Sequence, residues 1–141
     1  MKHEVPIRVN VVDPLKGVEM RVQRGRDELL PPSKASAKKL VFDFEITVDI
    51  SSNAPNFLGK YAQGPKDARF IYVNSGTYAG QGNTCWSRRA KLSLMSIDRK
   101  QIDDTLANKG SRIEVSMMGV GRDGGPTCAS VKDLVWNVIK K

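Results

Sequence analysis

The chain has 141 residues, of which 40% are hydrophobic and 27% are charged. This length is typical of one domain, and a domain of this size buries roughly two thirds of its unfolded surface without disulfides or metals. The composition excludes wholesale disorder, and no apolar run approaches the ~20 residues of a membrane-spanning helix. The segment Met1–Pro6 lacks the apolar core of a signal peptide. We therefore expect a single β-rich domain over residues 1–141, located in the cytoplasm, with no membrane partner.

Positive charge dominates the composition, with 23 Lys and Arg against 15 Asp and Glu and a net charge of +8. The excess lies in residues 1–39 and 71–100. Such a balance favours anionic partners such as nucleic acid, phosphorylated metabolites or an acidic protein. The alternative is that the charge serves solubility alone.

Metal-ligating side chains are scarce. The chain has two cysteines, Cys85 and Cys128, and one histidine, His3. These residues do not have the spacing of a zinc site, so we predict no metal and no cofactor. In a reducing compartment both thiols are expected to be free, although the sequence leaves a Cys85–Cys128 disulfide open.

The N-terminal third predicts two strands and a loop. Apolar residues alternate with polar ones from Val5 to Val11, which indicates a half-buried strand. Because Pro6 has no N–H for a β-ladder, this strand is expected to start late or to lie at a sheet edge. A turn over residues 13–17 and a second alternating segment over 18–22 complete a predicted hairpin. Residues 27–39 are predicted to form a mobile surface loop.

The clearest strand covers residues 40–50, with apolar residues on one face and charged residues on the other. This pattern indicates an antiparallel sheet with one solvated face. A long loop over 51–68 follows, and further strands are predicted over 69–73, 90–94, 112–118 and 134–139. Two glycine-rich loops, over residues 74–83 and 119–126, lie between these strands.

One helix is predicted after Asp98. Asp98 and Gln101 have the spacing of a capping box, and Ile97 and Ile102 have the spacing of a hydrophobic staple. Gly110 supplies a left-handed residue beyond the helix. The elements together predict a mainly β fold, a curled or barrel-like antiparallel sheet of about seven strands with one short helix over an opening.

The glycine-rich loops supply the candidate binding residues. Glycines let backbone N–H groups approach a ligand, and arginine holds anions through paired hydrogen bonds. We expect these two loops and the 51–68 loop to gather at one end of the sheet. The predicted ligand-binding residues are Asn56, Asn74, Trp86, Arg88, Arg89, Arg122 and Asp123. The alternative is structural, with Trp86 in the core and Arg122 paired with Asp123 in a tight turn.

No catalytic residues are predicted. His3 lies near a terminus, the pairs Asp43/Glu45 and Asp103/Asp104 have the pattern of solvated faces, and segment 24–28 has a self-neutralising charge pattern. We expect a binding module for a small anionic ligand or an acidic partner. Three alternatives stay open: a nucleic-acid-binding protein, an enzyme that uses Cys128 or an Arg/Asp site, and a structural or assembly protein. The low aromatic content of 6% disfavours nucleic-acid binding, and the sequence does not determine the oligomeric state.

Seven segments, taken in order, resemble a known family over nearly the whole chain. They are Pro6–Val9, Arg24–Leu29, Pro55–Gly59, Gln63–Pro65, Arg69–Thr77, Trp86–Lys91 and Gly121–Ala129. The pattern looks like the bacterial domain-of-unknown-function 5990 family. The resemblance implies a bacterial single-domain protein with no assigned activity, and it supplies no catalytic residues. Lys60 stands where we expect proline in relatives, which affects only the stiffness of that loop.

Overall fold

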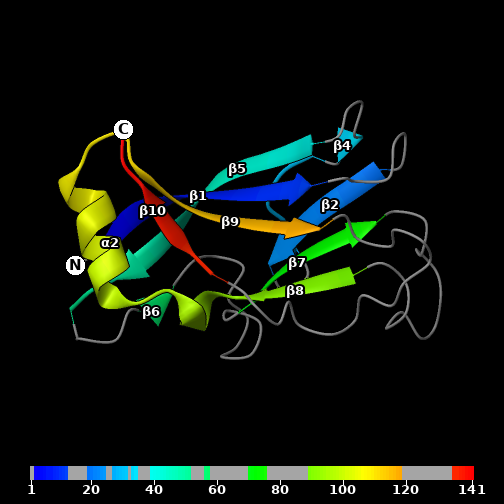
Figure 1. The fold of residues 1–141 in the computed structure, drawn as a ribbon. Coiled ribbons are helices and arrows are strands. Elements are labelled where there is room, and N and C mark those ends of the chain that lie inside the picture. Colours follow the sequence, from blue (N-terminus) through cyan, green and yellow to red (C-terminus); the bar gives the residue numbers. More distant parts are fainter. Residues whose placement is uncertain are drawn as a thin grey trace.

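The computed structural model describes residues 2–12, 19–24, 27–31, 33–34, 39–51, 56–57, 70–75, 89–118 and 135–141. Within this part of the chain the strands form two sheets (Figure 1). The first sheet has the order β10-β9-β1-β5-β6. Its strands are β1 (Lys2–Val12), β5 (Lys39–Asp49), β6 (Asn56–Phe57), β9 (Arg112–Met118) and β10 (Asn137–Ile139).

The second sheet has the order β3-β2-β7-β8, and β4 also pairs with β2. Its strands are β2 (Glu19–Arg24), β3 (Asp27–Glu28), β4 (Ser33–Lys34), β7 (Phe70–Ser75) and β8 (Arg89–Ser93). The expected barrel is wrong, because the described strands form two separate sheets and neither of these closes on itself. The expected count of about seven strands is not confirmed either, since the described residues alone contain ten strands.

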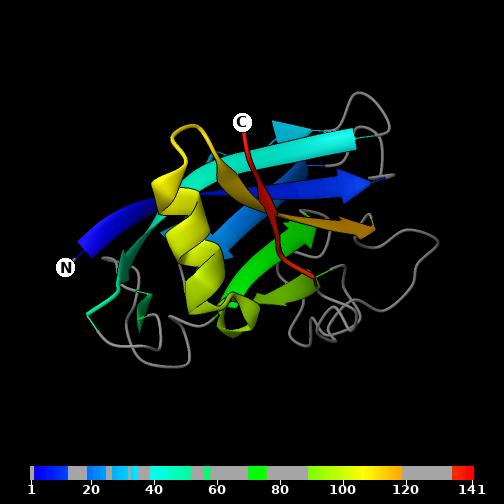
Figure 2. The same ribbon diagram turned by 60° about the vertical axis from the view of Figure 1, so that its left-hand side comes forward.

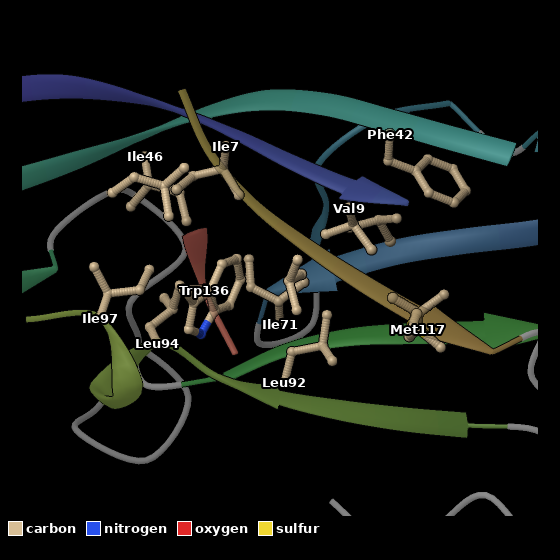
Figure 3. Close-up of a cluster of buried hydrophobic side chains, with 14 of the residues drawn as sticks. Ile7, Val9, Phe42, Ile46, Ile71, Leu92, Leu94, Ile97, Met117 and Trp136 are labelled. Atoms are coloured by element: carbon tan, nitrogen blue, oxygen red, sulfur yellow. The ribbon is translucent and has the colours of Figure 1, made fainter. Parts of the chain in front are cut away.

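The two sheets face each other across one hydrophobic core. Strict alternation produces the inner faces, because side chains in a strand point to opposite sides in turn. Figure 3 shows Ile7 and Val9 of the first sheet opposite Ile71 and Leu92 of the second. All four side chains are at most 1% exposed, so the fold is a sandwich whose stability depends on this interlayer burial.

Strand β1 is the third of the five strands in its sheet, so the expectation of an edge strand or a late start at Pro6 is wrong. It pairs antiparallel with β5 over its whole length and parallel with β9. The purely antiparallel sheet expected from the sequence is therefore wrong as well. The parallel pairing begins at Ile7 opposite Ile113, so at Pro6 the strand has a paired neighbour only on its β5 side. This register explains how a proline is tolerated here.

The predicted N-terminal hairpin is also wrong. β1 pairs with β5 and β9, whereas β2 pairs with β3, β4 and β7 in the other sheet. The chain thus crosses between the two layers after β1. The segment predicted as a loop over 27–39 contains β3 and β4, and the 51–68 loop contains β6.

The remaining strand predictions are confirmed in position. Four strands begin and end within two residues of their predicted bounds, namely β5, β7, β8 and β9. β10 ends at the predicted residue but starts three residues late. This agreement is expected because each of these strands carries its own apolar alternation.

The predicted helix is confirmed as α2 (Arg99–Ala107), which follows the short 3-10 helix η2 (Leu94–Ser96). The capping box is complete: the Gln101 N–H donates to Asp98 Oδ1 at 2.8 Å, and the Asp98 N–H donates to Gln101 Oε1 at 3.0 Å. Ile97 and Ile102 are both buried, as the staple requires. Gly110 has a φ of 88°, the left-handed conformation that the sequence predicts, although the helix already ends at Ala107.

Helix α2 lies beside the end of the sandwich at which β1 begins, and it packs on β1, β9 and β10 (Figures 1 and 2). Trp136, just before β10, connects the helix to the second sheet. Its indole Nε1–H donates to the Ser93 carbonyl at 3.0 Å, and its own carbonyl accepts from the Gln101 side chain. The ring is 4% exposed, so the helix end, β8 and β10 share one buried anchor.

Candidate basic face on the second sheet

The second sheet presents an outer face that combines cationic, amide and aromatic positions. On β2 and β7, Val22, Ile71 and Val73 are buried, so the residues between them belong to the opposite, outer side. We call the outer positions of β2, β7 and β8 the basic face. They are Glu19, Arg21, Gln23, Phe70, Tyr72, Asn74, Arg89, Lys91 and Ser93.

The strand register aligns these positions in rows. In one row Arg21 of β2 is opposite Asn74 of β7, and Asn74 is opposite Arg89 of β8. Neighbouring strands lie about 4.8 Å apart. Two arginine positions therefore flank one asparagine position across three strands, and long guanidinium side chains can reach one anion from such positions.

The adjacent row adds a cation and an aromatic ring. Gln23 is opposite Tyr72, and Tyr72 is opposite Lys91. Phe70 and Tyr72 follow each other on the same face of β7, with ring centroids 6.3 Å apart and ring planes at 43°. Both rings are half-buried. A tilted aromatic pair therefore lies on the same face as the row of Arg21, Asn74 and Arg89.

Acidic residues occur at the β2 margin of this face. Glu19 lies two residues before Arg21 on β2, and Glu28 of β3 is opposite Gln23. Across the described part of β7 and β8 the charged residues are Arg89 and Lys91, both cationic. In this part of the face the cationic positions thus lie on β8, next to the uncharged β7.

The structure brings two of the predicted ligand-binding residues together and separates a third. Asn74 and Arg89 are directly paired on β7 and β8. Asn56 lies on β6 in the first sheet, opposite Asp49, and Figure 1 shows β6 at the other end of the sandwich from the end of β7. The other four predicted residues, Trp86, Arg88, Arg122 and Asp123, lie outside the described residues, as do Cys85 and Cys128.

The sequence patterns did not identify Arg21, Phe70, Tyr72 and Lys91 as members of this face. The signal was present in the alternation of β7, where Phe70 precedes the buried Ile71 and Tyr72 lies between Ile71 and the buried Val73. The alignment with Arg21 could not be predicted, because it depends on the pairing of β7 with β2, which are far apart in the chain.

Arg24 belongs to the segment with the self-neutralising charge pattern, and its side chain is buried. It is 2% exposed and follows Met20 and Val22 on the inner side of β2. Desolvation by burial lowers the pKa of Arg24 from its ordinary value. A guanidinium remains protonated even so, and the inner side of the second sheet therefore contains a buried positive charge.

One protein-family model matches residues 5–139 of the chain, and its description is a family of unknown function (DUF5990). This match confirms the family expected from the sequence. No curated protein and no solved structure matches the chain. Among the described residues, neither helix has the length and apolar character needed to cross a membrane.

Proposed function

Since the chain belongs to the family of unknown function DUF5990, we propose its function from the site: a binding module for a small anionic ligand or an acidic partner. The observation that carries the proposal is the register of Arg21, Asn74 and Arg89 on three adjacent strands. Two arginines and an amide on one rigid sheet supply the donors that a phosphate or carboxylate needs. Lys91 adds a further positive charge one row away.

The proposed site keeps the predicted residues that lie outside the described part of the chain. Arg88 directly precedes Arg89 and Trp86 lies three residues before it, and we include both, together with Arg122 and Asp123, on the sequence prediction alone. Asn56 is left out of the site, because β6 belongs to the first sheet. No group in this proposal is assigned a catalytic role.

A thermal-shift screen at low salt tests the proposal. The panel contains inorganic phosphate, nucleotides, sugar phosphates, carboxylates and short nucleic acids. A ligand at one hundred times its dissociation constant stabilises the folded state by about 2.7 kcal/mol. We expect Arg89→Gln and Arg122→Ala each to weaken binding about tenfold or more, because each loses charge-assisted hydrogen bonds.

The matched control is Arg99→Gln, which removes the same charge from α2, where Arg99 Nε lies 2.9 Å from Asp103 Oδ1. This control should bind as the wild type does. No stabilisation by any anion, or equal losses in Arg99→Gln and Arg89→Gln, would contradict the proposal and favour the structural or assembly alternative. A size-exclusion mass measurement tests that alternative directly.

One observation favours a second candidate, a single-stranded nucleic acid as the anion. Aromatic side chains beside cations are the usual platform for stacked bases. Tyr72 lies one row from the Arg21–Asn74–Arg89 row, and Phe70 lies one row beyond Tyr72. This candidate predicts an affinity that falls steeply with salt, through counterion release. Affinity that is unchanged from low to moderate salt would exclude it and leave the small ligand.

A further inference from the structure

The outer face of the first sheet, opposite to the basic face, contains an open hollow of about 430 Å³. It crosses three neighbouring strands of the sheet. The charged residues of its lining are Arg8, Asp43, Glu45 and Arg112, and Pro6 belongs to the lining as well. The hollow therefore combines two arginines and two carboxylates with a proline.

One row of this face is filled by alternating charges. Arg8 of β1 is opposite Asp43 of β5 on one side and Glu114 of β9 on the other. Arg8 Nε and Nη2 donate to the two oxygens of Asp43 at 2.6 and 2.9 Å. This bond to Asp43, with the nearby Glu114 carboxylate, raises the pKa of Arg8 above its ordinary value. The Arg8 guanidinium is thus held in one orientation.

The next row lacks a charge in its centre. Pro6 is opposite Glu45 on β5, and extending the β1–β9 register by one residue places Arg112 on its other side. A cation and a carboxylate thus flank an uncharged proline, about 10 Å apart across two strand spacings. The hollow lies over this proline.

The arginines keep donors beyond their ion pairs. Arg112 Nε and Nη2 lie 3.0 and 2.9 Å from Glu114 Oε1. A guanidinium has five N–H donors, so Arg8 and Arg112 each have three donors beyond those contacts with Asp43 and Glu114. Both side chains are 30% exposed, which leaves part of each guanidinium accessible from solvent.

We propose that this hollow binds a free α-amino acid with an apolar side chain. The ligand carboxylate is held by Arg112, with Arg8 beside it, and the ligand ammonium is held by Glu45. Pro6 lines the space between the charges on the outer face, and its ring offers an apolar surface to the ligand side chain. A dipolar ligand restores the alternation of charge that Pro6 interrupts. The inference is independent of the anion site on the second sheet.

The test uses three probes with the same hydrocarbon chain: L-leucine, isoamylamine, which lacks the carboxylate, and 4-methylpentanoate, which lacks the ammonium. Each is titrated into ¹⁵N-labelled protein and followed by amide chemical shifts. We expect L-leucine to shift the amides of Ile7, Glu45 and Arg112, and to bind at least tenfold more tightly than either analogue, because each analogue loses one charged contact.

Variants locate the site. Glu45→Gln and Arg112→Gln should each weaken L-leucine binding at least tenfold, and Arg99→Gln, a matched charge loss on α2, should not change it. Pro6→Lys places an ammonium in the centre of the row and should abolish binding. Circular dichroism checks that each variant is folded.

Three results would overturn the proposal. One is no shift with L-leucine at millimolar concentration. Another is an analogue that binds as tightly as L-leucine, which would mean that the hollow recognises only one of the two charged groups of the ligand. The third is equal weakening in Arg99→Gln and Arg112→Gln. Because the basic face is not involved, its anion binding should be the same in all four variants as in the wild type.

Discussion

Replacing Trp136 with phenylalanine tests the anchor between α2, β8 and β10. The indole Nε1–H donates to the Ser93 carbonyl at 3.0 Å, and the ring is 4% exposed. Phenylalanine has no N–H, and the loss of one such hydrogen bond costs about 1 kcal/mol. The smaller ring also removes about 40 Å³, which at the usual cavity cost is about 1 kcal/mol. We therefore expect Trp136→Phe to lower the free energy of unfolding by about 2 kcal/mol.

Urea denaturation followed by far-ultraviolet circular dichroism measures this change. Tryptophan fluorescence is less suitable, because the substitution removes one of the two tryptophans. In a thermal scan the same loss corresponds to a decrease in Tm of roughly 6–10 °C. Val135→Ala is the control, since the neighbouring side chain is 59% exposed and its truncation should cost less than about 0.5 kcal/mol. A Trp136→Phe variant as stable as this control would refute the buried anchor.

Two further predictions concern single side chains. Asp98→Ala removes the acceptor of the Gln101 N–H and should lower the free energy of unfolding, measured by urea denaturation, by about 1 kcal/mol. Asp98→Asn should be nearly as stable as the wild type. Equal losses in the two variants would contradict the N-cap. The Ser51 hydroxyl and N–H donate to Asp49 Oδ1 at 2.6 and 2.9 Å, and these bonds lower the pKa of Asp49 from 3.8 to about 2. A carboxyl pKa lowered by folding stabilises the folded state above pH 3.8, and this contribution is lost as the pH falls towards about 2. In an NMR titration Ser51→Ala should raise the pKa of Asp49, and an unchanged midpoint would exclude the serine as its cause.

Local patterns were sufficient for the elements that depend on their own residues. The alternation over 40–50 predicts β5, and the Asp98–Gln101 spacing predicts both the start of α2 and its capping hydrogen bonds. These signals are readable because a strand or a cap requires particular residues at particular spacings within a few positions.

The candidate sites needed more than local patterns. Asn74 and Arg89 were selected from loop chemistry, and their direct pairing follows from the antiparallel register of β7 with β8. Arg21 joins them only because β2 pairs with β7 across some fifty residues of chain. Asn56 was selected by the same reasoning but does not join them, because its strand β6 pairs with β5 in the first sheet.

The sequence by itself determined the mainly β class, the position of most strands, the capped helix and the family. Each of these depends on residue types at short, regular spacings. Only the tertiary structure decided that β1 and β2 separate into two layers, that β1 pairs in parallel with β9, that Arg24 is buried and that Pro6 is opposite Glu45. These features depend on which strands pair and in which register. Strand pairing is set by burial of the whole core, so no single segment of the chain encodes it.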